Sequence, residues 1–248
     1  MSPTPVPHLA GLFHAAPPFA SFGGAVEFIF TPQTSNVTGG KTVGGFSQVV
    51  ELTITQLELT VLALALSLAV ALPIGLYLGH RGIGEFFAIG FGNAGRAVPE
   101  LALIALMAAA IGVGVLNLTI ALAVLGVPPI LTNAFVGVRQ VDRSTVDAAR
   151  GMGMTELEVL RRVEVPLAIP TIFSGIRGAT IVIVATATIA PLAGVLTLGD
   201  FIINENVYGA NGVLAGAILV ALLALTLEFS LAGLQRLLTP EGMKVGTA

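Results

Sequence analysis

Beyond residue 58, four long stretches without a charged side chain divide this sequence. Asp, Glu, Lys and Arg are absent from 59–80, 101–138, 178–199 and 206–227. Because a bilayer core of about 30 Å needs about 20 helical residues, three of these stretches each fit one membrane crossing. The stretch 101–138 is nearly twice as long and contains Gly112-Val113-Gly114, which predicts a tight turn between two crossings.

The pattern predicts an all-α membrane protein with five core transmembrane helices, at about 55–79, 86–112, 116–138, 168–192 and 212–236. The second begins near Phe86, so it carries Arg96 and Glu100 within it. Composition supports the same class, since 55% of the 248 residues are hydrophobic, 10% are charged and the mean hydropathy is +0.94. A soluble domain of this size needs far more charge on its surface. The absence of Cys excludes disulfides and thiolate sites, and a net charge of −3 indicates no nucleic-acid partner.

The basic residues predict the orientation in the membrane. With five spans, the segments that follow the first, third and fifth spans lie on one side. These segments carry Arg81, the arginines of 139–162, Arg236 and Lys244, whereas Lys41 falls on the opposite side. By the positive-inside rule the N-terminus is outside and the C-terminus is in the cytoplasm. We expect the protein in a prokaryotic plasma (inner) membrane.

The first fifty residues differ from the rest of the chain. Several prolines break any regular helix, 19–30 is apolar and aromatic enough for the outer interface of the bilayer, and 31–45 is expected to form an external loop. A sixth span in this region is the alternative. The expected organisation is an extracytoplasmic segment over 1–50, a transmembrane domain over 51–238 and a cytoplasmic tail over 239–248.

The longest polar segment, 139–166, lies on the predicted cytoplasmic side and predicts two short helices. Ser144 with Asp147, and Thr155 with Glu158, each match a capping box, in which a hydroxyl and a carboxylate satisfy free amides at a helix start. The segment is therefore a structured loop with its own helix starts.

A glycine corner, Gly151-Met152-Gly153, joins the two predicted helices. Glu158 and Arg162 are spaced to pair on one face of the second helix. An apolar stripe lies on its other face, formed by Leu157, Leu160 and Val163. A solvated connector is the plain alternative. A short helix with a small flat face, polarizable Met and flanking Arg favours a surface that docks into a groove of a partner.

The same loop resembles a known motif. Asp147-Ala148-Ala149, then Gly153, then Val163-Glu164-Val165-Pro166 resembles the EAA loop of binding-protein-dependent ABC-importer permeases of the MetI-like family. The spacing agrees throughout, with Asp in place of Glu at 147 and Val at 163 and 165. The resemblance extends over about 50–236. Segments such as LPIGLYLGHRG and GRAVPELALIALM look like the osmoprotectant branch, whose members import glycine betaine, choline, carnitine or proline betaine.

This resemblance implies the type I ABC-importer permease fold and a role in transport. It implies three kinds of partner: cytoplasmic ABC ATPase subunits, a second permease copy or a homologous permease, and an extracytoplasmic solute-binding protein. ATP and Mg would bind to the ATPase, because this chain has no GxxxxGK[ST] phosphate loop, and we expect no cofactor in the chain itself. The ATPase-coupling residues that it implies are Asp147, Ala148, Ala149, Arg150, Gly151, Gly153, Thr155, Val163 and Pro166.

Ionisable residues inside a membrane are candidates for function. One interpretation places Arg96, Pro99, Glu100 and Glu228 along a translocation pathway, where a carboxylate would favour a cationic quaternary ammonium group. The other, which we favour, pairs Arg96 with Glu100 to hold two helices and gives Glu228 a polar neighbour.

Two other classes fit the sequence less well. An intramembrane enzyme would need catalytic groups inside the spans, but none of the three histidines lies deep in a span and Cys is absent. A secondary transporter or channel would be expected to show an inverted repeat, which this sequence lacks. A permease of the same class for another small polar solute, such as an amino acid, is the closer alternative.

Overall fold

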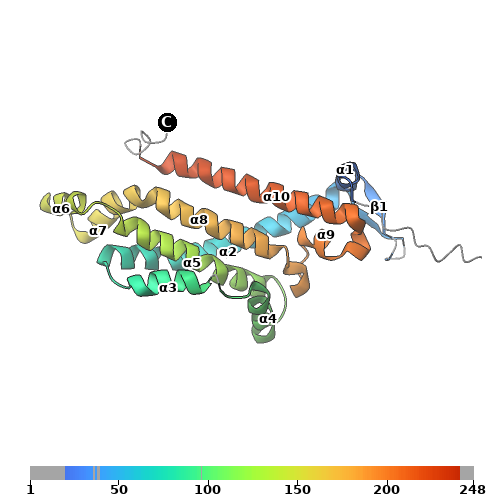
Figure 1. The fold of residues 1–248 in the computed structure, drawn as a ribbon, viewed down its shortest axis with the longest axis horizontal. Coiled ribbons are helices and arrows are strands. Elements are labelled where there is room, and N and C mark those ends of the chain that lie inside the picture. Colours follow the sequence, from blue (N-terminus) through green and yellow to red (C-terminus); the bar gives the residue numbers. More distant parts are fainter. Residues whose placement is uncertain (1–19, 36, 38–39, 96, 241–248) are drawn as a thin grey trace, which may run out of the picture.

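A computed structural model describes residues 20–35, 37, 40–95 and 97–240, and the molecule is elongated along its helices (Figure 1). Within this described part, four helical segments are long and apolar enough to cross a membrane. They are α2 (Gly45–Arg81), α5 (Val115–Arg139), the continuous segment Glu156–Ala187 that ends in α8 (Val165–Ala187), and α10 (Glu205–Leu238). These correspond to four of the five predicted spans.

The remaining predicted span, 86–112, is not one continuous helix. It is divided into α3 (Glu85–Gly95), which packs along α5, and α4 (Glu100–Ile111), which points away from the bundle in Figure 1. The division has a local cause, because Pro99 disfavours helical backbone at the residue before it and serves as the N-cap of α4. The prediction of an unbroken second span was therefore wrong. The tight turn predicted after it is confirmed, with φ of +86° at Gly112 and +132° at Gly114.

Helix α5 occupies the middle of the bundle, between α2 and α8 (Figure 1). Small residues allow α2 to approach it closely, since a Cβ atom on Gly79 would lie 2.9 Å from the carbonyl oxygen of Phe135. The interior is apolar and includes the fully buried Leu118, Leu122 and Ile183. Burial of these faces holds the three helices as one unit.

Buried polar side chains tie the bundle together. Gln56 on α2 is fully buried, and its amide nitrogen donates to the carbonyl of Val184 at 3.2 Å while its amide oxygen accepts from the backbone N–H of Leu198 at 3.1 Å. The hydroxyl of Ser67 donates to the carbonyl of Ala123 on α5 at 2.9 Å. In a bilayer such groups have no water to bond with, so each bond also satisfies a group that would otherwise be unpaired.

One end of the molecule carries a small cap, in which helix α1 (Phe22–Phe30) packs on α10 and the strands β1 (Pro32–Thr34) and β2 (Thr42–Gly44) form an antiparallel hairpin. The region predicted as a plain external loop therefore contains a hairpin. Helix α1 has nine residues, about 13 Å at 1.5 Å per residue, which is too short to cross a bilayer.

An aromatic cluster joins this cap to the segment before α10. Phe28, Phe201 and Tyr208 pack edge to face, with ring centroids 4.9–6.2 Å apart. The buried carboxylate of Asp200 accepts hydrogen bonds from the Tyr208 hydroxyl and the Asn204 amide. Short helical elements complete the described fold: α6 (Arg143–Gly151), α7 (Glu156–Val159), a π-helical turn (Leu160–Glu164), a 3₁₀ turn (Ala190–Ala193) and α9 (Gly199–Ile203).

Candidate coupling loop and membrane cavity

The 139–166 loop lies at the end of the molecule opposite the cap and begins with α6 (Figure 1). Asp142 caps this helix, since its carboxylate accepts from the backbone N–H of Ser144 at 2.9 Å and from the Ser144 hydroxyl at 3.0 Å. The predicted capping box of Ser144 with Asp147 was therefore wrong. A charged carboxylate two residues earlier in the chain is the stronger acceptor for the free amides, and it places the helix start there.

The glycine corner after α6 is a Schellman motif. Gly153 has φ of +87°, its N–H bonds to the carbonyl of Arg150 at 2.9 Å, and the N–H of Met154 bonds to the carbonyl of Ala149 at 3.3 Å. Of the two glycines in the predicted corner, Gly153 is the one in the left-handed region, where other residues are strained. Gly151 is the last residue of α6.

The second predicted helix start is confirmed. Thr155 and Glu158 form a capping box, in which the Thr155 N–H donates to the Glu158 carboxylate at 3.0 Å and the Glu158 N–H donates to the Thr155 hydroxyl at 3.4 Å. The predicted pair of Glu158 with Arg162 is also present, at 3.7 Å. From Thr155 the chain continues without a break into α8. A π-helical turn precedes Pro166, which has no N–H to continue the regular bonding pattern.

One side of the loop packs inward. Val146 and Ala149 of α6 are buried in a cluster with Val141 and Val159, and Val163 packs against it. The predicted apolar stripe included Leu157, but this side chain is 55% exposed. Val159, which the predicted stripe did not include, is buried instead. The helix continues as a span, so the bundle rather than the loop alone decides which face is covered.

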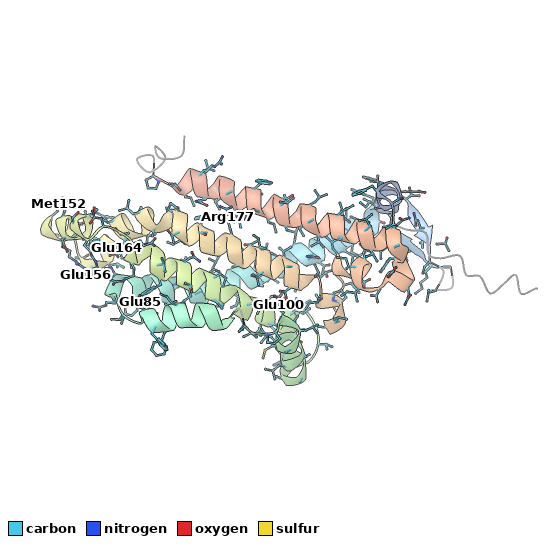
Figure 2. The ribbon with its side chains drawn as sticks, viewed as in Figure 1. Glu85, Glu100, Met152, Glu156, Glu164 and Arg177 are labelled. Atoms are coloured by element: carbon cyan, nitrogen blue, oxygen red, sulfur yellow. The ribbon has the colours of Figure 1, made fainter. Side chains whose placement is uncertain are left out.

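The other side of the loop faces solvent. Met152 is 72% exposed and lies at the end of the molecule (Figure 2). Ala148, Gly151 and Leu157 are also exposed. Small and apolar residues therefore share this surface with charged ones, which is typical of a protein contact rather than of a solvated connector.

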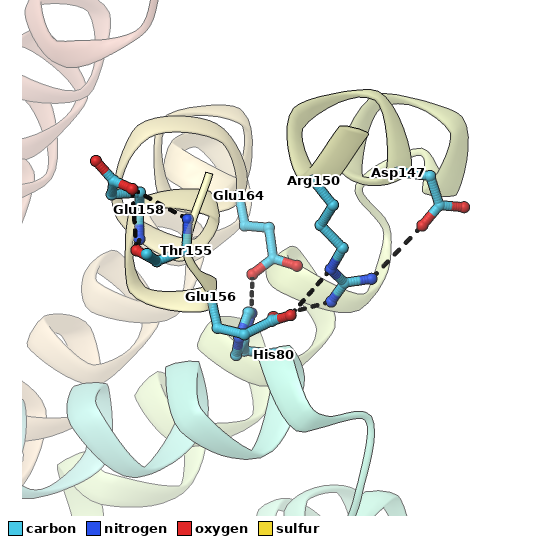
Figure 3. Close-up of polar contacts among 7 residues, drawn as sticks. All are labelled: His80, Asp147, Arg150, Thr155, Glu156, Glu158 and Glu164. Atoms are coloured by element: carbon cyan, nitrogen blue, oxygen red, sulfur yellow. Dashed lines mark hydrogen bonds and ion pairs between the residues drawn. The ribbon is translucent and has the colours of Figure 1, made fainter. Parts of the chain in front are cut away.

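A network of charged side chains lies where the loop meets the end of α2 (Figure 3). Arg150 lies 3.5 Å from Asp147 and donates to Glu156 from Nε at 3.2 Å and Nη2 at 3.0 Å. The Glu156 hydrogen bond raises the pKa of the Arg150 guanidinium. His80, at the end of α2, lies between Glu156 and Glu164. We predicted roles for Asp147 and Arg150 but for none of the other three residues, which only the folded chain brings together.

A cavity of about 320 Å³ opens in the bundle beside Glu100. Gly95, Val98, Glu100, Leu125, Pro128, Pro129, Gly178 and Val182 line it. Glu100 is exposed and is the first residue of α4, so the break at Pro99 places it at a helix start rather than inside one continuous helix as predicted. Arg96 lies outside the described residues, and so does its predicted pair with Glu100.

Glu228 is not among the residues that line this cavity. Its carboxylate pairs with Arg177 of α8, whose Nε donates at 2.8 Å, while Arg177 Nη1 donates to Gln235 at 3.3 Å. The pair joins α8 to α10 (Arg177 is labelled in Figure 2). The polar neighbour expected for Glu228 is thus an arginine that the sequence also marks as ionisable. Among the described residues, no group of three or more His, Asp or Glu side chains could hold a metal ion.

Long apolar helices with exposed Leu and Phe on α2 and α10, and a structured polar loop at one end, define a multi-pass membrane protein. Residues 71–241 match the family model of the binding-protein-dependent transport system inner membrane component, and the chain belongs to this family. It is a permease subunit of an ABC importer.

Similar proteins agree with this assignment. The chain is 41% identical over 176 residues to the carnitine transport permease protein OpuCB of Listeria monocytogenes, covering 71% of this chain and 81% of the relative. It is 36% identical over 189 residues to the glycine betaine/carnitine/choline transport system permease protein OpuCB of Bacillus subtilis, covering 76% and 87%. An inward-facing structure of the MetNI methionine ABC transporter shares the fold, with a TM-score of 0.67 at 20% identity, covering 79% of this chain and 98% of that one.

Proposed function

We propose that this chain forms the membrane pathway of an ATP-driven importer for a compatible solute such as glycine betaine, carnitine or choline. Support comes from the relatives, whose names give these solutes and whose lengths are largely covered by this chain. Proline betaine belongs to the same chemical class. An amino acid is the competing substrate.

We further propose that the 139–166 loop is the site at which a separate cytoplasmic ATPase subunit docks. The observation that carries this proposal is the two-sided structure of the loop, in which Ala149 and Val159 are buried in an apolar cluster inside the loop while Ala148, Met152 and Leu157 face solvent. A partner that holds the outer side can therefore move the spans, because the loop continues without a break into α8.

The residues expected to couple the ATPase have different parts in this proposal. Ala148 and Gly151 provide a small surface for close contact, and Gly153 sets the bend between α6 and α7. Thr155 starts the second helix, and Pro166 ends the π-helical turn before the span. Ala149 and Val163 belong to the apolar cluster that holds α6 against the start of the second helix, and the ionic members are Asp147 and Arg150.

Energy for transport would come from the ATPase, where ATP and Mg²⁺ bind. Two permeases, either two copies of this chain or this chain with a homologous one, would enclose the pathway. ATP-driven closure of the ATPase pair would push their loops together and switch the spans between inward- and outward-facing packings. A soluble binding protein would deliver the solute to the end that carries α1 and the hairpin.

We place the pathway next to the cavity beside Glu100. Its wall is mostly apolar with one carboxylate, which suits a small solute with a methylated cationic headgroup. Pro99 belongs to this site as the N-cap of α4. A plainer explanation for Glu100 is the favourable interaction of a carboxylate with a helix N-terminus, and uptake by a Gln variant separates the two.

Cross-linking tests the docking proposal, and the absence of Cys from the chain gives a clean background. Met152→Cys and Leu157→Cys place single thiols on the exposed loop, and Phe22→Cys places a matched, 74% exposed thiol on α1 at the other end. A thiol-to-amine cross-linker should join the two loop variants, but not the α1 variant, to the ATPase. A complex in which the loop thiols never cross-link, or in which the α1 thiol does, would refute the docking site.

A further inference from the structure

His80 connects a membrane helix to the loop through both of its ring nitrogens. It is the second-to-last residue of α2. Its Nδ1 lies 2.6 Å from a carboxylate oxygen of Glu164, and its Nε2 lies 3.1 Å from one of Glu156. The side chains of His80 and Glu164 are 8% and 5% exposed, whereas that of Glu156 is 59% exposed. One arm of the contact is therefore buried, and the other is open to the cytoplasm.

The two ring nitrogens face carboxylates of different elements. Glu164 is the last residue of the π-helical turn, and Glu156 is the first residue of α7. An imidazole N–H is a donor and a carboxylate oxygen is an acceptor, so the buried Glu164 has a polar partner in His80. One side chain of α2 therefore contacts two points of the loop.

Other charged groups around this site come from each element nearby. Arg150 of α6 binds Glu156 on its far side and also contacts Asp147. Arg81 is the neighbour of His80 on α2, and the guanidinium groups of Arg139 and Arg143 lie beside Gly82 just after it. The chain of contacts thus runs from α6, through Glu156 and His80, to the end of α2 and the buried Glu164.

His80 adds a polar contact to the apolar packing between α2 and this part of the chain. Within the described residues, α2 packs on α8, into which the π-helical turn continues, and Leu76 of α2 and Leu160 of that turn pack against one apolar cluster. The backbone of α2 has no comparable packing against α6 or α7. The contact of His80 with Glu156 therefore joins α2 to α7, where direct packing between the two helices is sparse.

We propose that His80 is a positioning residue that transmits movement of the 139–166 loop to α2. The proposal rests on the proposed docking of an ATPase on this loop. When the loop moves, the imidazole moves the end of α2 with it through its contacts with Glu164 and Glu156. Loss of the imidazole removes both contacts, so coupling between ATP hydrolysis and transport weakens.

The first test separates positioning from simple structural support. The chain is purified with its ATPase, reconstituted with the binding protein, and assayed with radiolabelled glycine betaine, carnitine and choline. His80→Phe should lower uptake at least tenfold and also reduce yield, because it leaves Glu164 buried and unpaired. His80→Phe with Glu164→Met removes both polar groups and should restore yield and ATPase binding, while solute transported per ATP stays low. Recovery of that ratio together with yield would show that the pair is only structural.

The second test asks whether another donor side chain restores coupling. His80→Arg keeps N–H donors for the two carboxylates, so it should transport more solute per ATP than His80→Phe does. An equal ratio for these two variants would overturn the role of the His80 contacts. If the unchanged complex neither binds the ATPase nor transports, the proposed function itself fails. If it transports and His80→Phe matches it, the failure belongs to this inference alone.

Discussion

Replacement of Gly153 tests whether the bend between α6 and α7 is what the ATPase binds. Gly153 has φ of +87°, and no atom lies within 4 Å of where its Cβ would be. The Cβ atom of Ala at this position therefore meets no steric clash. The free-energy cost of Gly153→Ala is that of holding a residue with a Cβ atom in the left-handed region, about 1 kcal/mol. If docking requires the bend, Gly153→Ala should weaken ATPase binding about fivefold, the factor that corresponds to about 1 kcal/mol.

The assay is a binding titration of the purified permease with its ATPase, with two matched variants. Asn adopts the left-handed region more readily, so Gly153→Asn should bind more tightly than Gly153→Ala. Gly233 on α10 also has open space where its Cβ would be, but its φ is not positive. The Gly233→Ala variant should therefore bind the ATPase as tightly as the unchanged protein does. Gly153→Asp should reach the membrane but fail to dock, because it adds a charge to the contact surface. Equal affinity for Gly153→Ala and the unchanged chain would refute the reasoning.

Three further predictions concern the bundle. Glu228→Gln leaves Arg177 without a counter-ion in a partly exposed pair, so it should lower the free energy of unfolding by about 1–2 kcal/mol in thermal unfolding. Replacing both residues with Met should lower the free energy of unfolding less than Glu228→Gln alone does. Gln56→Leu leaves two buried backbone groups unpaired and should lower stability by about 2–4 kcal/mol in the same assay, and an unchanged midpoint would contradict the role given to this side chain. Glu100→Gln should reduce choline uptake about threefold or more while the complex stays intact. Unchanged uptake would remove Glu100 from the pathway.

Features that depend on local sequence could be predicted. The charge-free stretches locate four spans because a membrane helix needs an uninterrupted apolar run, whatever packs on it. The turn at Gly112–Gly114 and the capping box of Thr155 with Glu158 need only neighbouring residues. The site residues of the 139–166 loop are implied by the resemblance of this loop to the EAA motif, and their contact with an ATPase stays a prediction.

Features that depend on the folded bundle could not be predicted. Pro99 itself indicates a break in the helix, but we gave more weight to the length that a continuous second span needs. Asp142 competed with Ser144 for the same helix start, and only the observed backbone decides between them. His80 meets Glu164, 84 positions away, because α2 and the loop end at the same side of the bundle. Neither periodicity nor composition contains that pairing.

The most direct test of the account is uptake by proteoliposomes that contain this chain and its ATPase, with the solute-binding protein outside and ATP inside. The account predicts uptake of labelled glycine betaine, carnitine or choline that requires both ATP and the binding protein and stops when the ATPase is inactivated. Uptake that persists without either one, or uptake of an amino acid with none of these solutes, would contradict it.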